Sequence, residues 1–158
     1  MEQYRFAKFT LLIEGIHKCI QKIKLDTVAE HGIKGVHVFW LYTLLRHEGG
    51  LTATELAGEN MIDRSLVSRE IAHLKKAGLV KFSGNGNGRS YNSRITLTDE
   101  GRSLAEQIVG EVVEVQGAVG AGISEEELIS FYATLEKLNR NFQSLTAPSG
   151  EKNFKEIT

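Results

Sequence analysis

The segment from Leu51 to Gly101 constrains the fold of this chain more than any other. It contains two short amphipathic helical stretches joined by a tight turn, then two β-like runs joined by a Gly- and Asn-rich loop, and then the start of another helix. Glycine and asparagine tolerate the left-handed backbone that such a loop needs. This order predicts a helix-turn-helix with a β-wing, a unit that can present one helix to the major groove of DNA and one loop to the minor groove or backbone.

Local signals place the two helices of this unit. Thr52 and Glu55 have the spacing of a capping box, which predicts a helix over 53–58. Asp63 is expected to be the N-cap of the second helix, over 64–77. The inner face of that second helix is predicted from apolar residues at helical spacing: Val67, Ile71 and Leu74.

The wing and a preceding helix complete the predicted domain. The wing is expected over 79–98, with the loop GNGNG between its two strands. A helix over 35–48 is apolar on all sides, so we expect it to be buried in the middle of the fold. The winged helix-turn-helix domain is therefore predicted over 35–98.

Helical segments with a narrow apolar seam flank this domain, and a polar tail follows at 148–158. The N-terminal segment, 1–34, has coiled-coil-like spacing in one set of residues: Phe6, Phe9, Ile13, Ile16, Ile20 and Ile23. The last helix of the C-terminal segment, 99–147, has it in another: Leu128, Phe131, Leu135, Leu138, Phe142 and Leu145. We expect both seams to pack against a second copy of the chain in a homodimer. The alternative is packing of the seams against each other in a monomer.

Charge is distributed unevenly along the 158 residues, although the net charge is only −1. Residues 64–98 contain seven Lys and Arg residues against one acid, Glu70. Such a segment attracts a polyanion, and a solvated basic surface is the alternative reading.

No apolar run reaches the roughly 18 residues of a membrane span. The single Cys19 excludes an internal disulfide and fits a cytoplasmic protein.

Residues 51–101 resemble the MarR family of winged-helix transcriptional regulators. The resemblance lies in LTATELA, in SLVSREIAHLKKAGLV and in an arginine-containing wing that runs into ITLTDEG, and the flanking helices extend it over nearly the whole chain. It implies a mainly α (α+β) fold, a winged helix-turn-helix domain with N- and C-terminal dimerisation helices. Many members have an Asp-x-Arg pair in the wing, where this chain has Asn87-Gly88-Arg89.

The candidate DNA contacts lie on the recognition helix and the wing. Arg69 is long enough to bind guanine O6 and N7, with a surface salt bridge or a phosphate contact as the alternative. His73 either reaches a phosphate or is solvated. Arg89 is assigned to the wing tip, against the minor groove, and Arg94 to the stem. The full set is Arg64, Ser65, Ser68, Arg69, His73, Lys75, Asn85, Asn87, Arg89 and Arg94.

The resemblance also implies a small aromatic or anionic effector. The candidate ligand-binding residues, for which plain core packing is the alternative, are Phe9, His17, His37, Trp40 and Tyr42. Cys19 is a candidate redox sensor, or else an inert small hydrophobic residue. The histidines lack the compact spacing of metal ligands, so neither a metal nor another cofactor is expected.

The sequence therefore predicts a dimeric, sequence-specific DNA-binding transcriptional regulator, acting as a ligand-responsive repressor on a pseudo-palindromic operator. The alternative is a winged-helix module that binds proteins and no longer binds DNA. An enzyme is not expected. The glycine-rich loop at 84–88 lies between strands rather than at a helix start, and no nucleophile has a base at a recognisable spacing.

Overall fold

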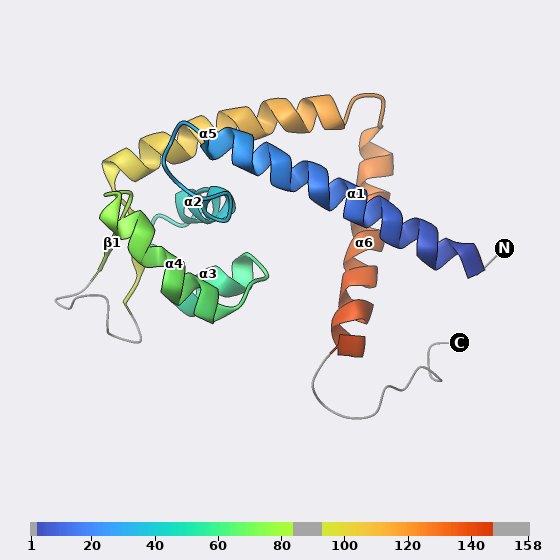
Figure 1. The fold of residues 1–158 in the computed structure, drawn as a ribbon, viewed down its shortest axis with the longest axis horizontal. Coiled ribbons are helices and arrows are strands. Elements are labelled where there is room, and N and C mark those ends of the chain that lie inside the picture. The colour runs from blue at the N-terminus through green and yellow to red at the C-terminus, as the bar shows by residue number, and fades with distance from the viewer. Residues whose placement is uncertain (1–2, 84–92, 147–158) are drawn as a thin grey trace. The chain divides into compact units, whose positions relative to one another are not determined.

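The computed structural model describes residues 3–83 and 93–146, and these are mostly helical (Figure 1). The elements are α1 Gln3–Val28, α2 His37–Arg46, α3 Ala53–Glu59, α4 Arg64–Lys76, β1 Val80–Phe82, β2 Ile95–Leu97, α5 Asp99–Val119 and α6 Glu125–Thr146. The chain forms two compact units, Met1–Val115 and Gln116–Thr158. None of the helices in the described part of the chain is long and apolar enough to span a membrane. The predicted mainly α fold with a small β-wing is confirmed.

Helix α2 supplies much of the core of the first unit, and it lies in the interior of that unit in Figure 1. Trp40 and Leu41 are almost completely buried. The prediction that this helix is buried on all sides is wrong, because Phe39 and Tyr42 are 40% and 37% exposed. Lysine and arginine side chains cover these two rings: Lys24 Nζ lies 4.4 Å from the centre of the Phe39 ring, and the Arg46 guanidinium lies 5.8 Å from that of Tyr42.

The same helix is shorter than the predicted 35–48. A turn precedes it, in which the backbone N–H of His37 donates to the Lys34 carbonyl oxygen at 2.8 Å. The backbone N–H of Lys34 in turn donates to His37 Nδ1 at 3.2 Å. This turn keeps residues 34–36 out of the helix and fixes the orientation of the His37 ring.

The two strands form the base of the wing. They pair antiparallel, with Val80 opposite Leu97 and Phe82 opposite Ile95. Leu51, just before α3, bridges to Ile95 through backbone hydrogen bonds of 3.0 and 2.7 Å. The wing stem is therefore attached to the start of the helix-turn-helix.

The run LTDEG joins β2 to α5 through two side-chain effects. Thr98 Oγ1 accepts a hydrogen bond from the Gly101 N–H at 3.0 Å and donates to the Gly78 carbonyl oxygen at 2.6 Å. A Cβ atom on Gly101 would overlap the Leu79 carbonyl oxygen. The threonine caps the helix and the glycine allows the close approach of α5 to the end of the helix-turn-helix.

The apolar seams at the two ends of the chain stay largely exposed. On α1, Phe6 is 65% and Ile16 is 50% exposed. In the second unit, α6 begins at a capping box in which the Glu127 N–H donates to Ser124 Oγ at 3.3 Å, and none of its residues is buried. Phe131 on this helix is 50% exposed.

Candidate nucleic-acid interface

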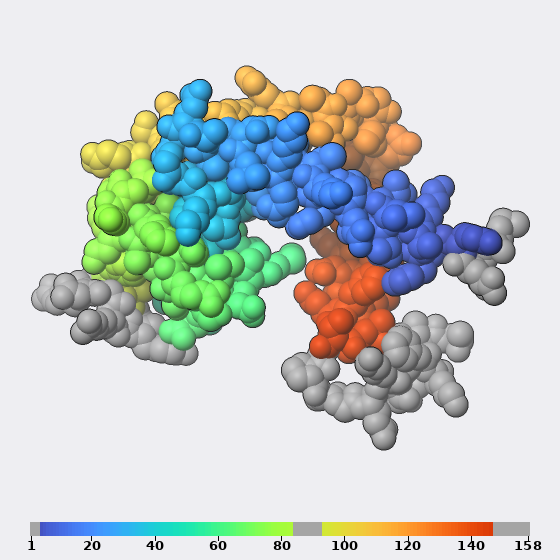
Figure 2. Space-filling view, viewed as in Figure 1, coloured from blue at the N-terminus to red at the C-terminus, as the bar shows by residue number. Residues whose placement is uncertain are grey.

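Helix α4 turns one face to the core and the other to solvent, and Figure 2 shows it (green) at the surface of the first unit. Val67 and Leu74 are fully buried and Ile71 nearly so, as the helical spacing predicts. The opposite face is exposed and includes every α4 residue predicted to contact DNA: Arg64, Ser65, Ser68, Arg69, His73 and Lys75. The inner face thus anchors a helix whose outer face is polar and basic.

Individual side chains on this outer face have different neighbours. Arg69 forms no salt bridge with the residues that the structure describes, so the predicted salt-bridge alternative is not observed there. Ser68 Oγ donates to the Arg64 carbonyl oxygen at 3.1 Å. Lys75 Nζ lies 5.2 Å from the centre of the Phe82 ring, so its stem packs against β1.

Asp63 occupies the N-cap position of α4, as predicted, and its side chain makes no capping hydrogen bond. Its carbonyl oxygen instead accepts from the Leu66 N–H at 2.9 Å. Because Asp63 is exposed, water can serve the remaining N–H groups at this helix start.

The turn before α4 is fixed by Asn60, a residue that sequence reasoning missed. Its Nδ2 donates to the Leu56 carbonyl oxygen at 2.9 Å and to Thr43 Oγ1 at 3.2 Å. Met61 follows with a φ of 52° and a 77% exposed side chain. An asparagine before a left-handed residue at a helix end is the sequence signal that could have indicated this turn.

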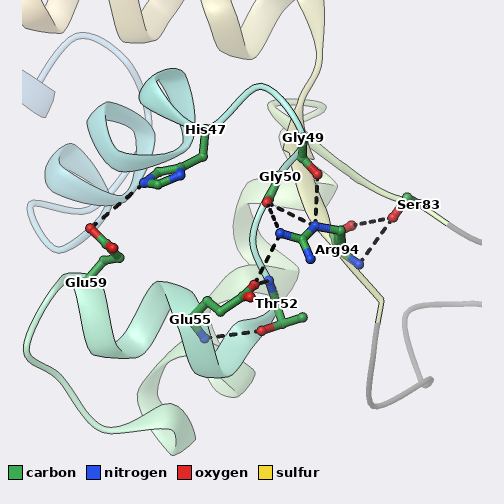
Figure 3. Close-up of polar contacts among 8 residues, drawn as sticks. All are labelled: His47, Gly49, Gly50, Thr52, Glu55, Glu59, Ser83 and Arg94. Carbon is green, nitrogen blue, oxygen red and sulfur yellow. Dashed lines mark hydrogen bonds and ion pairs between the residues drawn. The ribbon is translucent and has the colours of Figure 1, made fainter.

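Arg94 joins the wing stem to the start of α3 (Figure 3). Its Nε donates to the Gly49 carbonyl oxygen at 3.0 Å, and its Nη2 donates to the Gly50 carbonyl oxygen at 2.9 Å and lies 3.5 Å from Glu55 Oε2. Arg94 was predicted to contact DNA from the stem. In the structure, most N–H groups of the Arg94 guanidinium contact groups of the same chain. A DNA contact by Arg94 stays a prediction.

Glu55 has a second role in the same place. Its carboxylate accepts from the Thr52 N–H at 2.7 Å, while its own N–H donates to Thr52 Oγ1 at 3.2 Å, which confirms the predicted capping box. The hydrogen bonds to Thr52 lower the pKa of Glu55, with a smaller contribution from Arg94. The carboxylate is therefore charged at neutral pH and faces the guanidinium of Arg94.

Glu70 lies at the centre of a polar cluster on the flank of α4. Its Oε2 is 2.7 Å from Lys34 Nζ and 3.0 Å from His73 Nδ1. Hydrogen bonds from Lys34 and His73 lower the pKa of Glu70 to about 2. His73 thus has an intramolecular partner three residues earlier on the same helix, a spacing at which side chains on a helix meet. This cluster ties α4 to the segment between α1 and α2.

The five predicted ligand-binding residues do not form one enclosed aromatic site. His37 and Trp40 are buried, with ring centres 5.4 Å apart. Tyr42 is exposed, and so is His17, whose ring lies 3.5 Å from the Gln21 amide within α1. Phe9 is half-buried on α1.

Three other expectations concern residues outside these clusters. Cys19 is exposed on α1. No group of three metal-ligating side chains is found among the residues at 3–83 and 93–146. The predicted wing contacts Asn85, Asn87 and Arg89 lie outside the described residues.

The elements from α2 to β2 define a winged-helix protein. Residues 31–90 match the model of the MarR family. This match confirms the resemblance seen in the sequence.

Named relatives extend this similarity along the chain. The HTH-type transcriptional regulator PecS of Dickeya dadantii is 28% identical over 140 residues, which are 85% of this chain and 78% of PecS. The uncharacterized HTH-type transcriptional regulator YwhA of Bacillus subtilis is 28% identical over 121 residues, 77% of this chain and 85% of YwhA. A MarR family regulator from Listeria monocytogenes, solved with a 26-mer DNA, has a TM-score of 0.73 at 23% identity, covering 84% of this chain and 87% of that one.

Proposed function

We propose that this protein is a dimeric, sequence-specific DNA-binding transcriptional regulator that acts as a ligand-responsive repressor. The observation that supports it best is the exposed basic face of α4, on a helix whose inner face is buried in the core. Relatives named as transcriptional regulators, and a similar fold solved with DNA, point the same way. Because these relatives are regulators, an enzyme is not the reading we favour. Acting on the chromosome, the protein would work in the cytoplasm.

Helix α4 is the element we assign to the major groove. Arg69 is exposed at its middle and free of salt bridges with the described residues, and a guanidinium can donate two parallel hydrogen bonds to guanine O6 and N7. Lys75 and Arg64, nearer the two ends of the helix, would bind phosphates. Base contacts would give specificity, and phosphate contacts would fix the register of the helix on the duplex.

A second copy of the chain would cover the exposed seams. Exposed apolar side chains on α1 and α6, such as Phe6 and Phe131, lose contact with water in a dimer, which favours association. A two-fold dimer presents two copies of α4, and half-sites one helical turn apart, about 34–36 Å, match such a pair. We therefore propose a pseudo-palindromic operator, at which the bound dimer blocks transcription.

The experiment is a titration of fluorescently labelled duplex DNA with the protein. The DNA comes from the region that flanks the gene of this protein, and its fluorescence anisotropy is measured at several salt concentrations. The mass of the free protein and of the complex is measured by light scattering. We expect a dimer that binds one site, with affinity that falls steeply with salt. A dimer that ignores DNA even at low salt would favour the protein-binding module instead, and a monomer would contradict the proposed assembly.

A further inference from the structure

The carboxylate of Glu70 joins α4 to the segment between α1 and α2 through three nitrogen groups. One of its oxygens, Oε2, lies 2.7 Å from Lys34 Nζ and 3.0 Å from His73 Nδ1. The same oxygen lies 3.5 Å from His37 Nε2. The His37 side chain is 1% exposed and that of Glu70 is 17% exposed, so their contact is largely shielded from water. All four residues belong to the first compact unit.

The contacts of His37 determine the protonation state of its ring. The backbone N–H of Lys34 donates to Nδ1 at 3.2 Å, and a ring nitrogen that accepts a hydrogen bond bears no proton. The neutral ring therefore has its proton on Nε2, which faces Glu70. Burial is the main cause that lowers the pKa of His37. The charge of Glu70 opposes this effect, and the charges of Lys34 and His73 add to it.

A second proton on this ring is incompatible with the turn before α2. Both nitrogens of an imidazolium are donors, so Nδ1 can no longer accept from the Lys34 N–H. The two N–H groups would face each other at hydrogen-bond distance, so the turn has to open. The new charge also attracts the Glu70 carboxylate to Nε2, because charge-assisted hydrogen bonds are the stronger ones. Protonation therefore breaks a backbone contact of the turn and strengthens a contact to α4.

The surroundings of the ring leave room for this change. A cleft of about 380 Å³ borders the turn, and its lining includes Lys34 and His37. On the α2 side the Trp40 ring packs against His37, with ring centres 5.4 Å apart. The charged and titratable groups around the ring are Lys34 from its own segment and Glu70, His73 and Lys76 from α4. Glu70 is the one acid among the described residues whose charge favours the protonated ring.

We propose that His37 is a proton-operated switch that keeps α4 positioned for DNA while its ring is neutral. Protonation opens the turn at Lys34 and pulls on Glu70, the neighbour of Arg69 in α4, so the affinity for DNA falls as the pH is lowered. The effect on DNA binding rests on the function proposed above, whereas the opening of the turn does not. Exposed histidines act in the opposite direction, because each proton that they gain adds positive charge and favours a polyanion. A fall in affinity at low pH therefore distinguishes the switch from general titration.

The turn itself is observed by NMR on the full-length protein between about pH 7.5 and about pH 5. The ring nitrogens of His37 and the backbone amide of Lys34 are followed together. We expect both to change with a common midpoint, and the Lys34 amide to exchange faster with solvent once the ring is protonated. A ring that is still neutral at about pH 5, or a Lys34 amide that does not respond when His37 titrates, would overturn the switch.

A variant of Glu70 tests the partner of the ring. Glu70→Gln removes the charge that favours the protonated ring, so we expect the midpoint of His37 to move to lower pH. The control is His47→Asn, which replaces a histidine that also faces a glutamate, with Nε2 3.9 Å from Glu59 Oε2, but is 38% exposed. This control should leave the midpoint of His37 unchanged. A midpoint of His37 that stays or rises in Glu70→Gln would contradict the proposal.

The consequence for DNA is tested with His37→Asn. The asparagine amide oxygen can accept from the Lys34 N–H, and this side chain gains no proton. Duplex DNA from the region that flanks the gene of this protein is titrated by anisotropy at about pH 7.5 and about pH 5.5, at one salt concentration. We expect the affinity of the unmodified protein to fall about fivefold or more between the two, the low end of typical coupling between sites. The affinity of His37→Asn should not fall.

The outcomes separate the switch from the proposed function. A loss of affinity at low pH that persists in His37→Asn, or a turn that opens without any change in affinity, would overturn the link between His37 and DNA binding. If His37→Asn does not fold, Glu70→Gln takes its place, and its loss of affinity should begin at a lower pH than that of the unmodified protein. A turn that opens in a protein that binds no DNA at any pH would leave the proton-driven turn standing and remove the proposed regulator.

Discussion

The guanidinium of Arg94 and the carbonyl oxygen of Gly50 are joined by an Nη2–H hydrogen bond of 2.9 Å and an Nε–H bond of 3.1 Å (Figure 3). Gly50 has a φ of 72°, and a Cβ atom there would lie 2.5 Å from the Ile95 carbonyl oxygen. The loop before α3 and the strand β2 therefore fit closely, and Arg94 fastens them together. The wing stem is anchored to the start of the helix-turn-helix in this way.

Replacing Arg94 with lysine should destabilise the protein, because a lysine ammonium cannot reproduce the fork that reaches Gly49 and Gly50 together. We expect the free energy of unfolding to fall by about 1–2 kcal/mol, measured by urea denaturation at fixed protein concentration.

The control for this change is Arg102→Lys. Arg102 and Arg94 have equally exposed side chains, 44% each, but Arg102 only faces Glu48 at 3.8 Å. An exposed ion pair of this kind contributes little to stability, so we expect Arg102→Lys to change the free energy of unfolding by no more than about 0.5 kcal/mol. Equal effects of the two substitutions would show that Arg94 does not anchor the stem.

Two glycines in α5 should respond oppositely to alanine. A Cβ on Gly101 overlaps the backbone of Leu79, so Gly101→Ala should cost about 2–3 kcal/mol of unfolding free energy. Gly110 has nothing within 4 Å of an added Cβ, so Gly110→Ala should stabilise the helix by about 0.5–1 kcal/mol. Thermal or urea unfolding of both variants measures the difference. A Gly101→Ala protein as stable as the original would contradict the close approach of α5 to Leu79.

Local patterns in the sequence predicted most of the fold. The capping box of Thr52 and Glu55 depends on residues three apart, and the inner face of α4 depends on helical spacing, so both could be read directly. The N-cap position of Asp63 was predicted as well, although the position of a cap does not determine where an exposed carboxylate turns, and this side chain makes no capping hydrogen bond.

The candidate site was less predictable because its contacts join distant parts of the sequence. Arg94 reaches Gly50, 44 positions away, and Lys34 reaches Glu70, 36 positions away. No periodicity or motif specifies such pairs, since they depend on how the elements pack. For the same reason the apolar pattern around Trp40 indicated a buried helix but gave no sign of the cleft beside His37.

Stability should fall as the pH is lowered through the range in which His37 titrates. Burial lowers the pKa of His37 below its ordinary 6.5, with Lys34 and His73 contributing in the same direction and Glu70 opposing them. Below about pH 6.5 the unfolded chain binds a proton that the folded ring resists. The loss continues until the pH reaches the lower folded pKa, with a slope of at most about 1.4 kcal/mol per pH unit for this group. Glu70, whose pKa is lowered to about 2, adds a separate loss of stability only at pH values below its ordinary pKa of 4.5.

Urea denaturation between about pH 7.5 and pH 5.5 measures this effect, and His37→Gln should show a smaller decrease than the unmodified protein. The other four histidines are present in both proteins, so the two proteins differ only at position 37. If the variant does not fold, the His37 ring can be followed directly by NMR. A His37 pKa at or above 6.5 in the folded protein would contradict the expectation.

Arg69 and Arg89 should affect DNA binding in different ways. We expect Arg69→Ala to weaken binding to the operator by about 1–3 kcal/mol and to change binding to unrelated DNA little, because a contact to a guanine edge is lost. We expect Arg89→Ala to weaken binding to all sequences and to flatten the salt dependence by about one unit per lost contact.

Anisotropy titrations of both variants against operator and scrambled duplexes separate the two cases. The control is Arg102→Ala on α5, which replaces an exposed arginine outside the proposed interface. Equal weakening of both duplexes by Arg69→Ala would move Arg69 from base recognition to a phosphate, and an unchanged salt slope in Arg89→Ala would remove Arg89 from the interface.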